Sequence, residues 1–178
     1  MSSIKIHGWD KKPRTMLRYL KVGDIFMLSL DYGSYAAGRI LSDVSIGNGV
    51  EFFDLLLPRP EVTVAQIESA KRIGTPVFIN SYGLFDRKSV GNWRIVGHHH
   101  GFVPGEERGV YFTYGVGPFW KIDLFDNEIQ ITESEARKLP LYVTQDDAKV
   151  KKWLVPLLHT PPEKRPTDMR CCYSWINE

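Results

Sequence analysis

Short β-favouring segments separated by turn residues recur along most of this chain, and they constrain its fold more than any other feature. Residues 24–30 and 35–41 are rich in apolar side chains and flank the turn sequence "DYGS", which predicts a β-hairpin. Gly38, inside the second segment, indicates a bulge or the close approach of another backbone. Residues 50–57 are mostly apolar, which predicts a central strand that ends at Pro58.

Five more strand-like segments follow at short spacing, with Gly, Asn or Pro between them. They read "PVFINSY", "NWRIVGH", "GVYFTYG", "FWKIDLF" and "NEIQIT". Because short turns join neighbouring strands in opposite directions, the pattern predicts a twisted, mostly antiparallel β-sheet of about six to eight strands.

Two or three short helices are predicted from their start signals. Thr63 and Gln66 form a capping box, in which each side chain binds a backbone N–H of the first helical turn. Lys71 and Arg72 then stand at the expected last turn, and Gly74 stands where a helix stop is expected. The first helix should therefore occupy most of the segment between residues 63 and 74.

The two later helices carry weaker stop signals. Thr132 and Glu135 repeat the capping box, but Pro140 keeps this helix short. Thr144 is the expected N-cap of the third helix, and Pro156 should end or kink it. Together with the sheet, these helices predict the α+β fold class.

The chain length and segment pattern predict a single folded domain. A chain of 178 residues fits one domain, and no internal repeat or long linker divides it. We expect residues 21–158 to form the α+β domain. A basic N-terminal extension over residues 1–20 should precede it, and a proline-containing C-terminal tail over residues 159–178 should follow.

Composition narrows the class of protein. Hydrophobic residues make up 43% and charged residues 25%, as in ordinary globular proteins, and the net charge of +2 makes nucleic acid an unlikely partner on charge alone. No apolar run approaches the roughly 18 residues that span a bilayer, and the N-terminus has no signal-peptide core, so no membrane association is expected. Because the neighbouring Cys171 and Cys172 cannot form a disulfide framework, we expect a cytoplasmic location.

Charge is unevenly distributed along the chain. Residues 1–22 hold six Lys/Arg against one Asp, a local charge of +5. Residues 122–147 hold seven acidic residues against two basic ones, a local charge of −5, and residues 149–170 return to +4 with six basic against two acidic residues. The acidic stretch is either a solvated surface or a surface that faces a basic partner.

Three consecutive histidines in "RIVGHHHGF" raise the question of a metal site. Alternate strand residues share a face, so His98 and His100 could bind one ion and support a small metal-dependent hydrolase. Zinc needs three or four ligands, however, and the sequence has no third candidate ligand at a spacing that is typical of zinc sites. Phosphate loops, nucleophile elbows and zinc-protease motifs are missing from the sequence, so we identify no catalytic residue and no cofactor. The basic termini leave an RNA-binding module as a further alternative.

The sequence resembles the immunity protein 26 family of bacterial polymorphic toxin systems. The segment "KVGDIFMLSLDYGSYAAGRIL" is similar to the family's opening, in which a Gly-Asp-Ile/Val-Phe strand leads through a glycine turn into a Tyr-Ala-x-Gly-Arg strand. Further similar segments are "VEFFDLL", "NWRIVGH", "PFWKIDLFDNEIQI" and "LPLYVTQDDAKVKKWL", so that the resemblance covers about residues 21–155. The chain departs from the family pattern at His99 and His100.

The resemblance implies a protein without an enzymatic activity that binds the C-terminal domain of a cognate toxin. Many such toxins are nucleases with basic clefts, which directs attention to acidic side chains. Aromatic side chains near them would supply affinity if they are exposed. The residues that we expect to contact the toxin are Glu106, Glu107, Tyr114, Phe119, Trp120, Asp123, Asp126 and Glu128.

Overall fold

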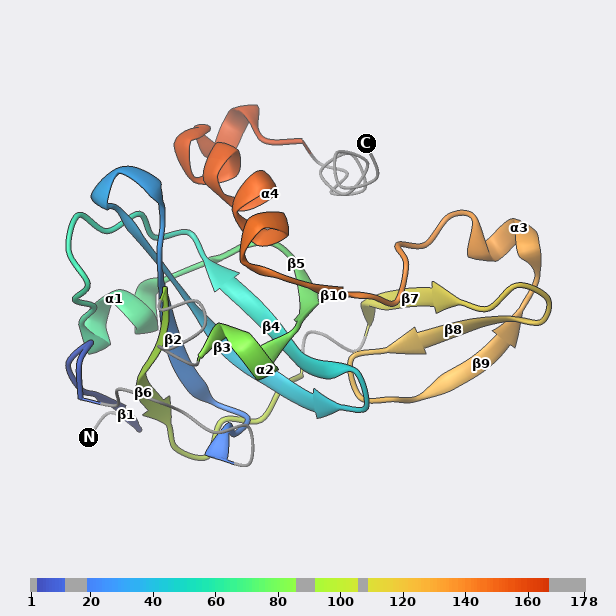
Figure 1. The fold of residues 1–178 in the computed structure, drawn as a ribbon, viewed down its shortest axis with the longest axis horizontal. Helices are drawn as coiled ribbons and strands as arrows, with labels where there is room; N and C mark the ends of the chain where they lie inside the picture. The colour runs from blue at the N-terminus through green and yellow to red at the C-terminus, as the bar shows by residue number, and fades with distance from the viewer. Residues whose placement is uncertain (1–2, 12–18, 86–91, 106–108, 167–178) are drawn as a thin grey trace.

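Two β-sheets and four α-helices build the computed structural model of this chain, which describes residues 3–11, 19–85, 92–105 and 109–166 (Figure 1). In the large sheet the strand order is β1-β6-β2-β3-β4-β5-β10, and in the small sheet it is β7-β8-β9. All pairs are antiparallel except β5 with β10, which confirms the predicted α+β domain with a mostly antiparallel sheet. None of the helices in these four ranges has the length and apolar character to cross a membrane.

The strands and helices have the following bounds, grouped by sheet and type. The strands of the large sheet are β1 (Ile4–Ile6), β2 (Asp24–Ser29), β3 (Tyr35–Val44), β4 (Gly47–Phe53), β5 (Arg72–Ile79), β6 (Trp93–His99) and β10 (Thr144–Gln145). The strands of the small sheet are β7 (Tyr111–Tyr114), β8 (Phe119–Asp123) and β9 (Glu128–Ile131). The helices are α1 (Val64–Ser69), α2 (Ser81–Leu84), α3 (Glu133–Ala136) and α4 (Asp147–His159).

The hairpin of β2 and β3 stands in the middle of the large sheet, as the sequence predicts. Gly38 lies opposite Phe26 on one side and Phe52 on the other. A Cβ atom at Gly38 would stand 2.4 Å from the Glu51 carbonyl oxygen and 2.5 Å from the Phe26 ring. The predicted close backbone approach is therefore confirmed, and any larger residue at Gly38 would push the strands apart.

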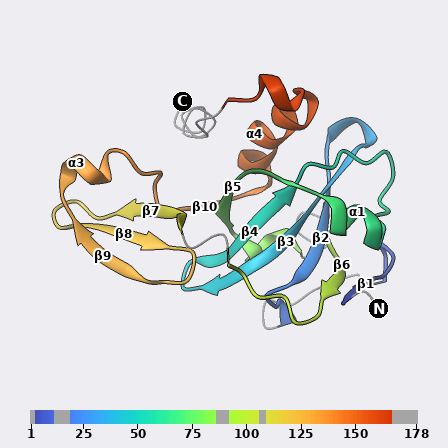
Figure 2. The same cartoon turned by 180° about the vertical axis from the view of Figure 1, so that it is seen from behind.

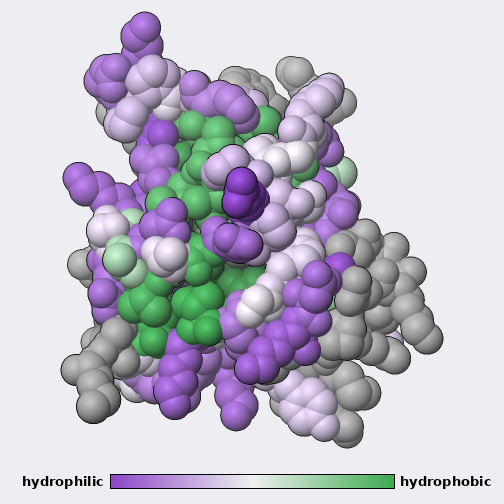
Figure 3. Space-filling model, turned by 90° about the vertical axis from the view of Figure 1, so that its left-hand side faces the viewer, coloured by the Kyte–Doolittle hydropathy of each residue, from purple (hydrophilic) through white to green (hydrophobic). Residues whose placement is uncertain are grey.

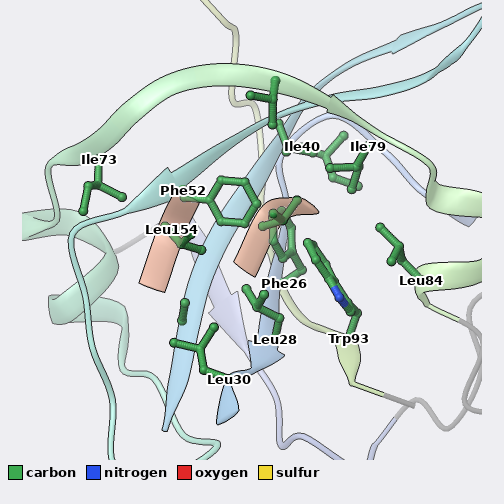
Figure 4. Packing of buried hydrophobic residues seen from close by; sticks show 14 of the residues in the cluster. Phe26, Leu28, Leu30, Ile40, Phe52, Ile73, Ile79, Leu84, Trp93 and Leu154 are labelled. Carbon is green, nitrogen blue, oxygen red and sulfur yellow. The ribbon is translucent and has the colours of Figure 1, made fainter. Parts of the chain in front are cut away.

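One face of the large sheet carries the main core, which α4 covers (Figure 4). The rings of Phe26 and Trp93 stack with centroids 5.4 Å apart, and Phe52 meets Trp153 of α4 edge to face at 5.5 Å. Buried indole N–H groups need acceptors, and Trp153 Nε1 donates to Gln145 Oε1 at 2.7 Å. This bond ties α4 to strand β10 while the rings exclude water.

The opposite face of the sheet packs against α1 and the segment that precedes it. The buried side chains on this face are Ile4, Ile25, Met27, Ala37, Phe53, Leu57, Val62, Ile67 and Val96. Figure 3 shows the end of the molecule opposite the small sheet, where apolar side chains reach the surface between polar ones. Leu56 is 40% exposed and is one of the large hydrophobic residues whose side chains are exposed to solvent.

The small sheet projects from the edge of the large sheet at which β5 and β10 lie (Figures 1 and 2). A third apolar cluster joins the two sheets, and its centre is the contact between Phe78 of β5 and Phe112 of β7, with ring centroids 4.8 Å apart. Leu41, Ile122 and Leu124 complete the buried part of this cluster. The side chains of the small sheet that face the large sheet are therefore buried, whereas much of the remaining surface of the small sheet is exposed to solvent.

The capping boxes at Thr63 and Thr132 are both present, but the predicted end of the first helix is wrong. Helix α1 ends at Ser69, before Lys71, and Arg72 opens strand β5. Gly74 lies within β5 with φ +71°, so it permits a local irregularity in the strand rather than a helix stop. The pairing of Arg72 with Phe53 on β4 supplies the sheet contacts that decide the conformation of this segment.

The start of α4 and the length of β4 also differ from prediction. Asp146, not Thr144, caps α4 by accepting a hydrogen bond from Lys149 N at 2.9 Å, because Thr144 belongs to β10 and pairs with Phe78. Pro156 lies inside α4, which continues to His159. Strand β4 ends at Phe53, and within the predicted remainder Leu57 forms only an isolated bridge with Tyr35.

Two short strands were not predicted. Strand β1 lies within the predicted N-terminal extension and pairs with β6, so that Ile4 lies opposite His99. Strand β10 pairs in parallel with β5. In the segment after α4, Arg165 forms a bidentate ion pair with Asp54, at 2.7 and 2.8 Å, which holds the beginning of the predicted tail against the domain.

Candidate functional site

The small sheet brings together most of the side chains that the sequence singles out for contact with a protein partner. Tyr114 lies on β7, Phe119 and Trp120 lie on β8, and Glu128 begins β9. Two more, Asp123 and Asp126, lie at the end of β8 and in the turn that follows it. Glu106 and Glu107 fall outside the described residues.

Asp123 holds the turn between β8 and β9. Its side chain is largely buried, and its carboxylate accepts hydrogen bonds from Phe125 N at 2.8 Å, Asn127 N at 3.0 Å and Asn127 Nδ2 at 2.9 Å. A carboxylate with three donors from its own turn satisfies backbone groups that would otherwise lack partners. Asp123 therefore shapes the surface, and its charge is directed inward.

Asp126 anchors the same turn to the large sheet. Its carboxylate accepts hydrogen bonds from Tyr142 Oη at 3.0 Å and from Ser45 N at 3.2 Å. Asp126 has φ +60°, a left-handed conformation that Asp and Asn adopt more readily than most residues. The residue type thus serves both the backbone conformation and the contact with the turn between β3 and β4.

Glu128 is exposed and pairs with an aromatic hydroxyl across the sheet. The hydroxyl of Tyr114 donates to Glu128 Oε2 at 2.5 Å. This hydrogen bond raises the pKa of Tyr114 above its usual value, because losing the phenolic proton beside a carboxylate is unfavourable. Glu128 keeps its solvent-facing position, so its charge remains accessible to a partner.

A groove with a volume of about 600 Å³ lies between the end of β7, helix α3 and residues 139–143. Three aliphatic side chains at this groove are widely exposed: Val116 at 96%, Leu141 at 57% and Val143 at 51%. Tyr114 and Phe119 line the same groove and are half-buried. Together these side chains expose apolar surface on both sides of the groove.

Sequence reasoning selected the aromatic residues at this groove but missed the aliphatic ones. Val116 carries a recognisable signal, since it is an apolar residue in the turn sequence "GVGP", where nothing in the local structure requires one. Leu141 and Val143 carry no such signal, because alternation in "LPLYV" reads as an ordinary strand. Their exposure depends on how the segment lies against β7.

A second polar cluster lies on the large sheet, on the face that carries α1. The buried Glu51 carboxylate accepts from Arg39 Nε and Arg72 Nε, both at 2.8 Å. Arg39 Nη1 also lies 3.0 Å from His99 Nδ1, and its guanidinium stacks on the Phe102 ring at 3.8 Å. Because a guanidinium can only donate, His99 Nδ1 is the acceptor and the ring is neutral in this arrangement.

Burial lowers the pKa of His99, and the charge of Arg39 lowers it further. The network joins charged side chains on strands β3, β4 and β5 to His99 at the end of β6. Glu51 accepts from two guanidinium groups and His99 accepts from one of them, so the cluster satisfies buried polar groups within the sheet. We assign it a structural role.

The histidines do not assemble a metal site in the described part of the chain. His98 Nδ1 bonds Asp24 Oδ1 at 2.8 Å, and the ring of His98 meets the ring of His100 at a centroid distance of 4.7 Å. Among the described residues, no three His, Cys, Asp or Glu side chains form a group that could hold an ion. Cys171, Cys172 and residues 12–18 of the basic N-terminal stretch lie outside those residues.

Comparison with known proteins identifies a family. The family model described as immunity protein 26 matches residues 21–117, which is a little over half of the chain. The matched stretch begins before β2 and ends in the turn between β7 and β8, so it includes Gly38, Arg39 and Glu51. No curated protein and no solved structure matches the chain.

Proposed function

The chain belongs to the immunity protein 26 family, and we propose that it binds and neutralises the C-terminal domain of one cognate bacterial toxin. The family match is the observation that carries this proposal. The protection is a stoichiometric blockade in the cytoplasm, in which the bound domain covers the active site or substrate groove of the toxin. The chain needs no reaction and no cofactor of its own for this purpose.

The toxin contacts the small-sheet surface, which we define by Tyr114, Val116, Phe119, Leu141 and Val143. Exposed apolar side chains that surround a groove are suited to bury surface against a partner, and binding energy usually concentrates in such a desolvated centre. Trp120 pairs with Tyr114 across the strands, and Glu128 accepts the hydrogen bond of the Tyr114 hydroxyl, so both residues adjoin this surface. Contacts of this kind would supply most of the affinity.

Acidic side chains around this surface favour a basic partner. Residues 122–136 contain five Asp/Glu and no Lys or Arg. Complementary charge speeds the encounter of two proteins and rejects partners of like charge. A nuclease domain, whose substrate-binding cleft is basic, fits this requirement, and Glu128 is the acidic side chain of this stretch that we expect to act directly.

Calorimetric titration tests the proposal. We predict that a gene beside this one encodes a large secreted toxin, and the probe is the C-terminal domain of that protein with its catalytic residue inactivated. We expect saturable binding with one chain per toxin domain. Absence of binding to that domain, under conditions in which both proteins are folded, would contradict the proposed function.

A further inference from the structure

In the described part of the chain, β8 is the one strand that pairs with β9, so β9 forms an open edge of the small sheet. Asp123 N donates to Asn127 O at 3.0 Å, which makes these two residues a hydrogen-bonded pair. In an antiparallel ladder such pairs alternate, so Lys121 with Ile129 and Phe119 with Ile131 are the next two. The backbone N–H and C=O groups of Glu128 and Gln130 consequently point away from β8.

The other edge of the small sheet is covered. Thr113 on β7 receives the Tyr142 N–H at 2.8 Å and donates its own N–H to the Pro140 carbonyl, also at 2.8 Å. The segment after α3 thus supplies the outer partners of β7. No described residue does the same for Glu128 or Gln130, and both views of the fold show β9 on the outside of the small sheet (Figures 1 and 2).

The side chains of β9 do not protect this edge as those of edge strands commonly do. Natural proteins discourage unwanted pairing with lysine, proline or a bulge, and none of these interrupts the sequence "EIQI". Ile129 is 58% exposed, although it is a β-branched apolar residue at the middle of the strand. An exposed edge of this composition is a template for one more strand.

The acidic side chains near β9 determine which kind of strand can pair with its open edge. Asp126 and Glu128 stand at the start of β9, and Glu133 and Glu135 follow its end. Arg137 forms an ion pair with Glu133, and Lys121 and Lys138 act electrostatically on Glu135. Within the described residues, the acidic side chains at the start of β9 accept hydrogen bonds from tyrosine hydroxyls, Asp126 from Tyr142 and Glu128 from Tyr114. Two copies of this chain would bring two acidic edges together, which is unfavourable, whereas a strand that carries Lys or Arg gains attraction.

We propose that the toxin adds a strand, bearing Lys or Arg beside an apolar residue, to the open edge of β9. The outward backbone groups of Glu128 and Gln130 form the new ladder, Glu128 faces a basic side chain, and Ile129 is covered. This inference rests on the proposed function and specifies how the toxin binds. The groove and β9 lie toward opposite edges of a three-stranded sheet, so one partner domain can contact both.

Amide hydrogen exchange, followed by NMR in the free chain and in the complex with the inactivated toxin domain, tests the pairing. We expect the Glu128 and Gln130 amides to exchange at least about tenfold more slowly in the complex. The Ile129 amide, which already bonds β8, should change less. Complex formation without this alternating protection would overturn the inference and leave the proposed function intact, whereas absence of any complex would contradict the proposed function.

A proline variant provides the second test. Gln130→Pro removes the outward N–H without removing a bond to β8, while Gln130→Ala removes only the side chain and serves as the control. We expect Gln130→Pro to weaken toxin binding at least about tenfold and Gln130→Ala to change it by less than about threefold. Equal affinities of two folded variants would overturn the inference. A free chain that is dimeric, with the Gln130 amide already protected, would overturn it as well.

Discussion

The Tyr142 hydroxyl donates a hydrogen bond of 3.0 Å to the Asp126 carboxylate, and this contact joins the segment before β10 to the turn between β8 and β9. Ser45 N donates to the second carboxylate oxygen at 3.2 Å. The three groups come from distant parts of the sequence, and together they fix the small sheet beside the large one. Asp126 therefore has a structural task that competes with any role in direct partner contact.

Removal of this contact should loosen the small sheet. We expect Asp126→Gly, which keeps the left-handed backbone, and Tyr142→Phe each to lower the free energy of unfolding by about 1 kcal/mol. The loss of unfolding free energy in the double variant should be smaller than the sum of the two single losses by at least about 0.5 kcal/mol, because both substitutions remove the same hydrogen bond. Urea unfolding of the four proteins measures this, and strict additivity would show that the two side chains do not interact.

Glu51 should contribute more to stability than an exposed carboxylate. Glu51→Gln leaves Arg39 and Arg72 without a counter-charge in a site where Glu51 is buried, and we expect a loss of about 3 kcal/mol in the free energy of unfolding. Glu133→Gln, which breaks the exposed pair with Arg137, is the matched control and should have no measurable effect. Equal effects in urea unfolding would refute the assignment of the cluster as structural.

His99 should make the fold less stable in mild acid. Its pKa in the folded chain lies below the usual value of 6.5, so near and below that pH the unfolded chain binds a proton that the folded chain does not. Stability from this residue is therefore complete above 6.5 and falls as the pH drops toward the lowered folded-state pKa. The groups that face the ring are Arg39, His98, His100 and Glu68.

A glutamine at this position can still accept from Arg39 but does not titrate. We expect the wild-type chain to lose more stability than His99→Gln when urea unfolding is compared at about pH 7.5 and about pH 5.5. A wild-type pH dependence in His99→Gln would contradict this account.

The exposed valine of the groove offers a way to separate binding from folding. We expect Val116→Asp to weaken toxin binding at least about tenfold and to change the free energy of unfolding by less than about 0.5 kcal/mol. Val103→Asp makes the same chemical change at a residue that is also widely exposed, 78%, but does not line the groove. Calorimetry should find Val103→Asp unchanged, and a loss of affinity in both variants would argue against a localised contact.

Much of the fold could be predicted because its determinants are local. The β2–β3 hairpin, the close approach at Gly38 and the capping boxes of α1 and α3 each depend on residues within a few positions of one another. The errors fall where distant pairing decides. Arg72 follows helix-forming residues but pairs with Phe53, and Thr144 has cap chemistry but pairs with Phe78. Local preference is weak against such contacts.

The candidate surface divides in the same way. The sequence located the acidic and aromatic residues of β7, β8 and β9, but it could not show that Asp126 receives a hydrogen bond from Ser45, 81 residues away. The chain order likewise did not reveal which edge of the small sheet stays open. That difference arises because Pro140 and Tyr142 bond Thr113, while Gln130 has no equivalent neighbour in the described residues.

Titration of active toxin with this chain tests the central claim most directly. A stoichiometric inhibitor must be added in an amount equal to the toxin, whereas an enzyme that inactivates the toxin is needed only in a small fraction of that amount. The toxin's activity on its own substrate is measured after equilibration with increasing amounts of the chain. We predict that activity falls in proportion to added chain and vanishes near one chain per toxin domain. Complete inactivation by a small fraction of an equivalent, growing with time, would reveal turnover and contradict the account, as would undiminished activity at a large excess.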